Sequence, residues 1–356
     1  MQQYKILAIN PGSTSTKIAV YTNEQIDFEQ VIRHSTEELK NFTKIYDQYD
    51  YRLQLVEKTL EDHNIEISHL SAIVGRGGPL KPITSGTYTV NKTMSEDLKV
   101  GVQAEHASNL GGLLAKGIAG KVGIPSFIVD PVSVDEFDPI ARISGIPEIP
   151  RRSLIHALNM KAVAHRVAND LHREYNSLTL ILVHLGGGIT VGIQTSGKMI
   201  DASNPVDSGP FSPERAGGVP SSDLVKMCYS GEYSFNEMKK KLVGNAGLVA
   251  HLNTNDGREI ENRIANGDAK AALIYEAMAY QIAKEIGAMA TVVNGELDAI
   301  VLTGGMAHSK LLVNIITERV NFIGKVLVYP GEDELQALVE GTLRVLRGEE
   351  QAKVYE

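Results

Sequence analysis

Two stretches of the chain place glycine and hydroxyl residues in a turn between two apolar strands. The first runs from Lys5 to Val20 and the second from Leu180 to Ile193. At such a hairpin tip the backbone N–H groups approach an anion closely, because glycine adopts φ > 0 at little cost and small side chains leave the backbone bare. The candidate contact residues are Gly12, Ser13, Ser15 and Lys17 in the first hairpin and His184, Gly186, Gly187 and Gly188 in the second. Two hairpins of one design indicate a duplicated, phosphate-binding nucleotide clamp.

A single glycine hairpin is usually an ordinary turn, so other nucleotide-binding signals matter. The chain has neither the G-x-x-x-x-G-K-[ST] motif nor a G-x-G-x-x-G motif after a strand. It does have a buried strand at Ala299–Leu302 followed by Gly304 and Gly305, where bare backbone can pass under an adenosine; the alternative is a plain strand-to-helix turn. Three such turns together favour phosphate binding.

Two arginines and one aspartate lie where the chain leaves a strand or enters a long loop. Arg76 is surrounded by three glycines, and nothing bulky obstructs a bidentate grip on a carboxylate or phosphate; the alternative is a surface arginine in a flexible loop. Arg215 belongs to the loop 207–220, which is unusually long for a simple connection. Asp130 ends a strand and is either a site carboxylate or a turn former.

Strands alternate with helices along the chain, which is typical of an α/β architecture. The expected helices are Leu39–His63, Ser95–Gly120, Ser153–Glu174, a helical stretch ending at Met289 and a final helix starting near Asp333; the further expected strands are Ser71–Val74, Ser126–Val129, one through Ile200, Ala299–Leu302 and Lys325–Tyr329. The irregular segment Asp138–Arg152, which contains three prolines, is the candidate crossing between domains. We therefore expect two domains, 1–150 and 151–334, with the first completed by a C-terminal helix at 335–356.

Composition excludes several classes of protein. The 356 residues are 43% hydrophobic and 22% charged, as in ordinary globular proteins, and the net charge of −8 argues against a nucleic-acid partner. The single cysteine, Cys228, builds neither a disulfide framework nor a thiolate zinc site. No secretion signal or membrane-length apolar run is visible. We expect a cytoplasmic protein without a membrane partner.

Four segments resemble the acetokinase family, and the resemblance extends over almost the whole chain. They are Asn10–Lys17, Val183–Thr190, Asp207–Arg215 and Val301–Gly305, of which the third is similar to the branch acting on butyrate and branched-chain acids. The resemblance implies a duplicated actin-like ATPase fold, shared with acetate kinase and hexokinase, with two domains and a central cleft. It also implies reversible phosphoryl transfer from ATP to a short carboxylic acid such as butyrate, giving an acyl phosphate and ADP, with Mg²⁺ and a homodimer or larger homo-oligomer.

Such a reaction needs no general base, because a carboxylic acid with a pKa of about 4 is already ionised at neutral pH. Catalysis then depends on positioning and on neutralising the charge that spreads over the phosphoryl oxygens. Arginines, a histidine donor, Mg²⁺ and backbone N–H groups are therefore expected to surround the transferred group.

The resemblance assigns roles to individual residues. It places Arg76 and Asp130 with His156 in the catalytic group and His106 beside the substrate, although His156 is also consistent with a packed core histidine and His106 with a cap. The metal-binding candidates are Asn10, Asp333 and Glu334; the alternative for the two acidic residues is a first helical turn that complements the helix dipole.

The chain departs from acetate kinase at two positions. Gly187 replaces an asparagine at the centre of the second glycine loop, and Pro220 stands where acetate kinase has its catalytic arginine. We hypothesise that Arg215 replaces that arginine from a shifted position. Acetate, propionate, isobutyrate or isovalerate are alternative substrates, since one methylene changes binding by only about 1–3 kcal/mol. An actin-like nucleotide sensor or assembly protein is the alternative of a different class.

Overall fold

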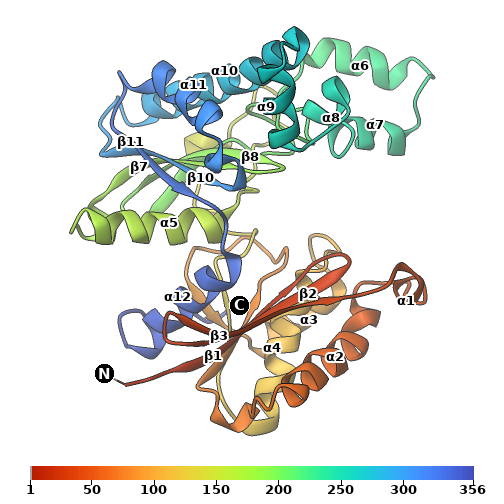
Figure 1. Ribbon diagram of the computed structural model, residues 1–356, viewed down its shortest axis with the longest axis vertical. Coiled ribbons are helices and arrows are strands. Elements are labelled where there is room, and N and C mark those ends of the chain that lie inside the picture. Colours follow the sequence, from red (N-terminus) through yellow and green to blue (C-terminus); the bar gives the residue numbers. More distant parts are fainter. Residues whose placement is uncertain (1) are drawn as a thin grey trace. The chain divides into compact units, whose positions relative to one another are not determined.

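The computed structural model describes residues 2–356, which form two compact units (Figure 1). Unit 1 contains residues 2–134 and Asp333–Glu356, and unit 2 contains Asp135–Glu332. The sequence places the first division after residue 150 and the C-terminal addition at 335. In the structure, residues 135–150 group with unit 2 because Asp138 N–H donates to Ile200 O at 2.9 Å and Arg151 N–H donates to Arg142 O at 2.9 Å.

Unit 1 is built on a six-stranded sheet with the order β3-β2-β1-β4-β6-β5. The strands are β1 (Lys5–Pro11), β2 (Ser15–Thr22), β3 (Gln25–Arg33), β4 (Ala72–Arg76), β5 (Thr87–Thr89) and β6 (Ser126–Val129). β1, β2 and β3 form an antiparallel meander, whereas β4 and β6 run parallel to β1. The predicted first hairpin and the strand at Ser126–Val129 are confirmed. β3 was not predicted, because most of its side chains are exposed and polar.

The helices of unit 1 are α1 (Thr36–Leu39), α2 (Tyr49–Asp62), α3 (Lys92–Val100), α4 (Asn109–Val122) and α12 (Glu334–Leu346). α4 packs on β4 and β6, and α12 packs on β1, β4 and β6. Two of the sequence predictions are wrong in extent. Helix α2 begins at Tyr49 and not at Leu39, and the predicted helix Ser95–Gly120 is split into two, since Gly101 ends α3 in the left-handed conformation.

Unit 2 is built on a five-stranded sheet with the order β11-β10-β7-β8-β9. The strands are β7 (Thr179–Leu185), β8 (Ile189–Thr195), β9 (Lys198–Ala202), β10 (Ala299–Gly304) and β11 (Val326–Pro330). β7, β8 and β9 form an antiparallel meander, and β10 and β11 run parallel to β7. Read from the other edge, β9-β8-β7-β10-β11 repeats the order and directions of β3-β2-β1-β4-β6. The duplication expected from the two hairpins is therefore present in the sheets.

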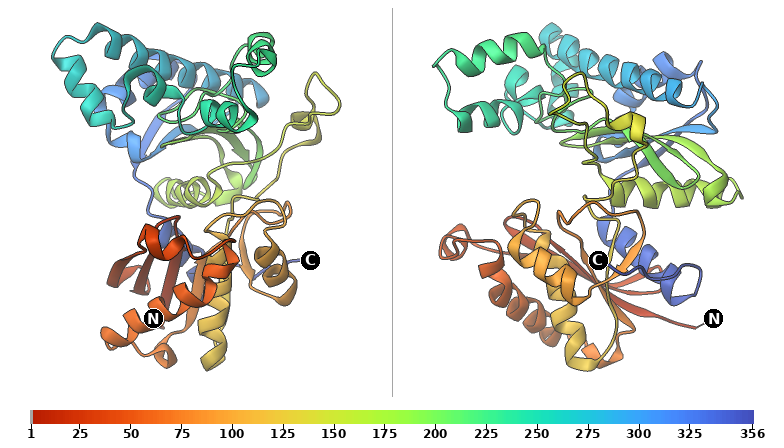
Figure 2. Two further views of the ribbon diagram at one scale, coloured as in Figure 1. Left: turned by 90° about the vertical axis from the view of Figure 1, so that its right-hand side faces the viewer. Right: turned by 180° about the vertical axis from the view of Figure 1, so that it is seen from behind.

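The helices of unit 2 are α5 (Ala157–Asp170), α6 (Ser221–Tyr229), α7 (Phe235–Leu242), α8 (Gly247–Leu252), α9 (Gly257–Ala265), α10 (Ala269–Val292) and α11 (Lys310–Val320). α5 covers one face of the sheet, while α10 and α11 cover the other (Figures 1 and 2). The core lies between the sheet and α10, with Ile282 and Ile286 fully buried against β-strand residues such as Val191. α5 begins at Ala157, later than the predicted Ser153.

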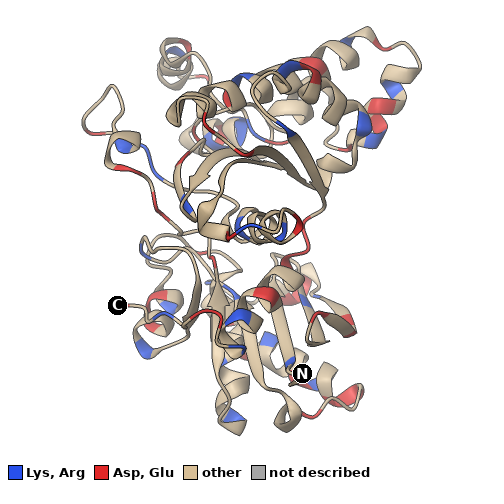
Figure 3. Cartoon of the chain, turned by 90° about the vertical axis from the view of Figure 1, so that its left-hand side faces the viewer, with Lys and Arg blue, Asp and Glu red and all other residues tan. Residues whose placement is uncertain are grey.

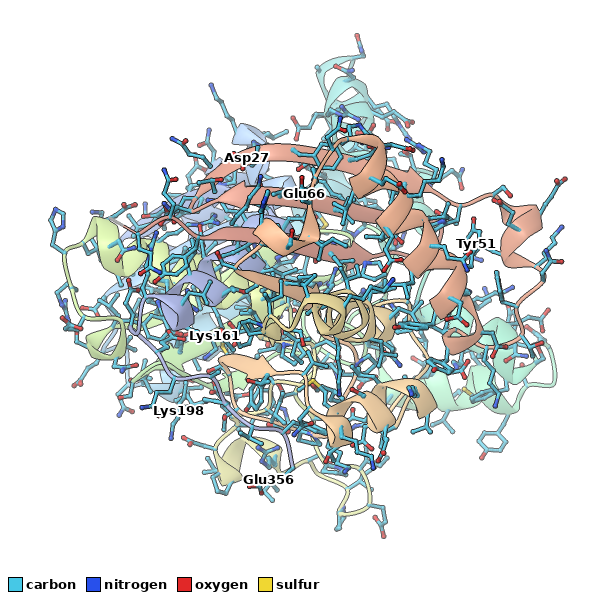
Figure 4. The ribbon with its side chains drawn as sticks, turned by 90° about the horizontal axis from the view of Figure 1, so that it is seen from below. Asp27, Tyr51, Glu66, Lys161, Lys198 and Glu356 are labelled. Atoms are coloured by element: carbon cyan, nitrogen blue, oxygen red, sulfur yellow. The ribbon has the colours of Figure 1, made fainter. Side chains whose placement is uncertain are left out.

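Charged residues are distributed over both units, with basic and acidic positions interspersed along helices and loops (Figure 3). One ion pair of unit 2 is buried: Lys161, labelled in Figure 4, donates to Glu136 at 2.7 Å and is 1% exposed. Among residues 2–356, no helix has the length and apolar character needed to span a membrane.

Candidate functional site

In unit 1, the tip of the β1–β2 hairpin is a tight turn. The strands pair as far as Pro11 and Thr16, and Gly12 N–H closes the turn on Ser15 O at 2.7 Å. Ser13 is exposed at the tip. Lys17 does not reach toward the tip, because its ammonium pairs with Glu29 of β3 at 3.0 Å. The tip therefore offers backbone groups and hydroxyls, and Lys17 is engaged elsewhere.

Asn10, Arg76 and Glu334 meet where two parallel strands end. Asn10 is the penultimate residue of β1, Arg76 is the last residue of β4, and Glu334 begins α12. The Asn10 amide Nδ2 donates to Glu334 Oε2 at 2.5 Å, and Arg76 Nη1 lies 2.5 Å from each Glu334 oxygen. The carboxyl ends of parallel strands are where open α/β sheets bind ligands. The structure thus brings together three residues that the sequence proposed separately.

His106 belongs to the same cluster. Its pKa is lowered, first because burial desolvates the ring and second because the Arg76 charge lies nearby, while Glu334 acts in the opposite direction. His106 Nδ1 is 2.8 Å from Ser108 Oγ, which fixes the ring. A neutral imidazole can donate a hydrogen bond to an incoming anion, while the neighbouring arginine supplies the positive charge.

The glycines around Arg76 are required by close packing. A Cβ on Gly75 would lie 2.0 Å from Gly111 O, and a Cβ on Gly78 would lie 2.2 Å from Asn109 Oδ1. The loop therefore lies tightly against the start of α4, so the flexible-loop alternative for Arg76 does not hold. Sequence reasoning identified the glycines but not the packing reason for them.

The two remaining acidic candidates of unit 1 have structural partners. Asp130 is 4% exposed, adopts φ +39°, and accepts a hydrogen bond from Gly86 N–H at 2.6 Å. Asp333 caps α12 by accepting from Gln336 N–H at 3.0 Å. Of the two acidic metal candidates, Glu334 is thus the one that contacts Asn10. Residues 2–356 contain no cluster of three or more His, Cys, Asp or Glu side chains arranged as metal ligands.

In unit 2, His156 and His184 form a stacked pair with ring centroids 3.9 Å apart. His156 Nδ1 lies 2.9 Å from Thr190 Oγ1, and His184 Nδ1 lies 2.8 Å from Asn159 Oδ1. Asn159 Nδ2 donates to Gly331 O at 3.4 Å, which orients its amide so that His184 Nδ1 is the donor.

The second nitrogen of His184 faces an acidic side chain. His184 Nε2 lies 3.3 Å from Glu332 Oε2, although the imidazole itself is only 2% exposed. Asn159 and Thr190 were not identified from the sequence. The position of Asn159 three residues after His156, near the start of the same helix, was the available signal.

The long loop of unit 2 packs on the tip of the β7–β8 hairpin. Ser212 Oγ donates to Gly187 O at 2.6 Å, and a Cβ on Gly188 would lie 2.4 Å from Arg215 Nη1. Burial lowers the pKa of Arg215, while neighbouring Glu214 raises it. Arg215 is therefore held beside the glycine tip that the sequence proposed for phosphate contact, and Gly188 is small because the guanidinium occupies the space.

A pocket of about 580 Å³ lies beside Gly305. Its wall is formed by the start of α9, one tyrosine of α10 and the turn after β10, with the lining residues Asp256, Gly257, Arg258, Glu261, Tyr275, Gly305, Met306, His308 and Ser309. Gly304 has φ +90°, and a Cβ there would lie 2.4 Å from Leu185 O, so no other residue fits. Apart from Gly305, the pocket residues carry no motif that the sequence could have revealed.

Similarity to known proteins indicates the family of the chain. Residues 148–335 match the model of the acetokinase family. The chain is 54% identical over 353 residues to butyrate kinase 1 of Clostridium acetobutylicum (strain ATCC 824), covering 99% of each protein.

Two solved structures are similar in fold. The acetate kinase of Porphyromonas gingivalis matches with a TM-score of 0.79 at 18% identity, over 96% of this chain and 100% of that one. A propionate kinase from Francisella tularensis subsp. tularensis SCHU S4 matches with a TM-score of 0.76 at 19% identity, over 95% and 98% of the two chains. Together with the duplicated sheet order, they confirm the actin-like ATPase fold expected from the sequence. The chain belongs to the acetokinase family.

Proposed function

We propose that the protein transfers the γ-phosphoryl group of ATP to butyrate in a reversible, direct in-line reaction that gives butanoyl phosphate and ADP. The observation that carries this proposal is the 54% identity to butyrate kinase 1 over 99% of the chain. The clustering of Asn10, Arg76 and Glu334 supports it, because these side chains are suited to anions and a metal ion.

Unit 1 supplies the groups for the carboxylate and the metal. Arg76 would hold the substrate carboxylate or the transferred phosphoryl group, with His106 donating a further hydrogen bond and Asp130 keeping the adjoining loop in shape. A carboxylate and an amide oxygen suit Mg²⁺, which retains waters and binds phosphate oxygens besides one or two protein ligands. Glu334 and Asn10 would hold the ion, and Mg²⁺ would neutralise phosphate charge when bound.

Unit 2 supplies the groups for the nucleotide. The pocket beside Gly305 has the size and the mixed apolar and polar lining expected of a base and ribose site. The backbone N–H groups of the second hairpin would face phosphate oxygens. Arg215, held over Gly188, would neutralise the charge of the phosphoryl group in transfer, in the role that another arginine has in acetate kinase. His156 would donate a hydrogen bond to the same oxygens, and the ring of His184, stacked on that of His156, would hold it in place.

The test is a substrate series. The purified protein would be incubated with MgATP and acetate, propionate, butyrate, isobutyrate or isovalerate, and acyl phosphate would be trapped as hydroxamate. We expect the highest kcat/KM for butyrate, with a loss of about 30-fold or more for acetate because two methylenes are missing. A preference for acetate would refute the butyrate assignment, and ATP turnover that needs no added acid would support the nucleotide-sensor alternative.

We also propose that the protein works as a homodimer or larger homo-oligomer in the cytoplasm. Family membership supports both statements. Light scattering at several protein concentrations tests the assembly, and a mass equal to one chain of 38.7 kDa at all of them would contradict it.

A further inference from the structure

Arg52 of α2 is a buried cation without a carboxylate partner. Its side chain is fully buried, and no Asp or Glu of residues 2–356 forms an ion pair with it. Burial lowers the pKa of Arg52 to about 10, so the guanidinium stays charged at neutral pH. A buried charge is costly unless it is well hydrogen-bonded. Its partners therefore indicate why it is there.

Those partners are oxygens of the first hairpin tip. Arg52 Nη1 donates to Gly12 O at 2.9 Å, to Ser15 O at 3.0 Å and to Thr16 Oγ1 at 3.1 Å, and Nη2 donates to Ser13 O at 3.1 Å. Gln48, one turn earlier on the helix side, accepts from Nε and Nη2 at 3.0 and 2.8 Å. Tyr51, labelled in Figure 4, marks this N-terminal end of α2.

The geometry of the peptide bond also determines the direction in which the N–H groups of the tip point. The peptide bonds within residues 2–356 are all trans, so the carbonyl of one residue and the N–H of the next point in opposite directions. Because Gly12 O and Ser13 O point at Arg52, the N–H groups of Ser13 and Thr14 point away from it. Both residues are exposed, and within residues 2–356 neither N–H donates a hydrogen bond.

The remaining groups around the tip reinforce this arrangement. Thr14 O accepts from His34 N–H at 2.9 Å, so a third carbonyl of the turn is also held inward. Thr16 Oγ1 accepts from Arg52 and forms a hydrogen bond with His34 Nε2 at 2.8 Å, so the hydroxyl links the guanidinium to the ring. Burial, followed by the Arg52 charge, lowers the pKa of His34 to about 4, and the ring is neutral at pH 7. Arg52 is thus the cation beneath the turn.

We propose that Arg52 is a positioning residue which aims the Ser13 and Thr14 N–H groups outward as a cradle for one phosphate oxyanion and supplies the buried positive charge behind it. The inference deepens the proposed function, since the ligand is the phosphate chain of ATP or the acyl phosphate. Two neighbouring N–H donors that point away from a buried cation form a preorganised anion site of the kind that stabilises phosphoryl groups. Arg52 itself does not touch the ligand.

The test uses two substitutions in the full-length protein and a matched control. Arg52→Met removes the charge and donors but keeps the bulk, and Arg52→Lys keeps the charge with at most three donors. Val56→Ala, one turn further along α2 and fully buried, destabilises the same helix without touching the turn. We expect kcat/KM for ATP to fall about 10–100-fold in Arg52→Met, less in Arg52→Lys, and not beyond the change in folded fraction in Val56→Ala.

A second readout follows the two amides directly. In ¹⁵N-labelled wild-type protein, the Ser13 and Thr14 signals should shift on titration with ATP, and Arg52→Met should abolish the shift while Val56→Ala retains it. Wild-type protein that forms acyl phosphate with no shift of these amides would overturn the inference, as would an Arg52→Met variant indistinguishable from Val56→Ala. If Arg52→Met does not fold, the wild-type titration and Arg52→Lys decide. Amides that shift in a protein making no acyl phosphate would refute the proposed function and support the cradle.

Discussion

The role proposed for Arg215 can be tested because its side chain and its backbone have separate partners. The backbone is held without the guanidinium: Arg215 N–H donates to Ser212 Oγ at 3.2 Å, and Ser212 N–H donates to Arg215 O at 3.0 Å. Arg215→Met should therefore leave the loop in place, with a change in unfolding free energy of about 1 kcal/mol or less. Stability and activity then report on different atoms.

The expected effect on activity is large. An arginine that neutralises the phosphoryl group in transfer is worth about 10³-fold or more in kcat, which is about 4 kcal/mol of transition-state stabilisation. The assay is hydroxamate-trapped butanoyl phosphate at saturating MgATP and butyrate, with kcat and both KM values measured. We expect the loss in kcat, with KM values within a few-fold of wild type.

Two further variants show whether a loss of kcat comes from the Arg215 guanidinium itself. Arg263→Met removes a guanidinium of unit 2 that donates to Leu252 O and to Asp268, so it should lower stability and leave kcat unchanged. Gly188→Ala keeps Arg215 but displaces it, since the new Cβ would lie 2.4 Å from Nη1; we expect a loss of about 10–100-fold in kcat. An Arg215→Met variant with kcat within three-fold of wild type would refute the role of Arg215.

Four other outcomes are expected. Glu334→Gln keeps one oxygen that accepts from both Asn10 and Arg76 but removes the charge, so half-maximal activity should need about 10-fold more Mg²⁺; an unchanged Mg²⁺ titration would contradict metal binding there. Asn159→Leu removes the acceptor that orients His184, so kcat should fall about 10-fold with little change in the KM for ATP, and an unchanged kcat counts against that role. The pKa of His34 is about 6.5 in the unfolded state and about 4 in the folded state. The free energy of unfolding should therefore be highest above pH 6.5 and about 2 kcal/mol lower at pH 5, and urea unfolding should find a smaller loss in His34→Gln. Tyr355→Ala removes a ring that is 2% exposed and a hydroxyl that donates to Asp97 at 2.7 Å, so the free energy of unfolding should fall by about 3–5 kcal/mol. The same substitution at Val354, which is 70% exposed, should have no effect.

The sequence predicted the elements whose side chains alternate or are continuously apolar. Both hairpins and the strand at Ser126–Val129 have this character, and their residues are almost all buried. β3 and β5 were not predicted, because β3 is a mostly exposed edge strand and β5 has only three residues. The periodicity of Leu39–His63 continued through a turn and a 3₁₀ segment before the true helix start at Tyr49, since local pattern does not reveal where backbone hydrogen bonds begin.

The candidate site divides in the same way. Residues carried by a motif, such as Asn10, Arg76 and His184, could be proposed from sequence alone. Their partners could not, because Arg76 and Glu334 are 258 residues apart and Arg52 lies in an ordinary amphipathic helix. From the sequence alone, an arginine in such a helix is predicted to lie at the surface, since arginine is rarely buried without a carboxylate. Only the hydrogen bonds to a turn 40 residues earlier distinguish it.

The duplicated sheets place different side chains at equivalent positions. Asn10 is the penultimate residue of β1, and His184 is the penultimate residue of β7, the strand in the equivalent place. Each contacts an acidic residue within its own unit, Glu334 in the first case and Glu332 in the second, and only one residue separates these two in sequence.

The neighbouring strands then differ at the same relative position. β4 ends with Arg76, whose guanidinium projects into the cluster, whereas β10 ends with Gly304, whose missing side chain lets the backbone pass within contact of Leu185. A long cation suits a small anionic substrate, and bare backbone beside a pocket suits a flat nucleotide base. The ends of the equivalent strands set the positions, and the residue at each position decides whether the unit presents a charged side chain or bare backbone. Exchanging the two designs by Gly304→Arg is therefore expected to abolish nucleotide binding, because the backbone at φ +90° has no room for a Cβ.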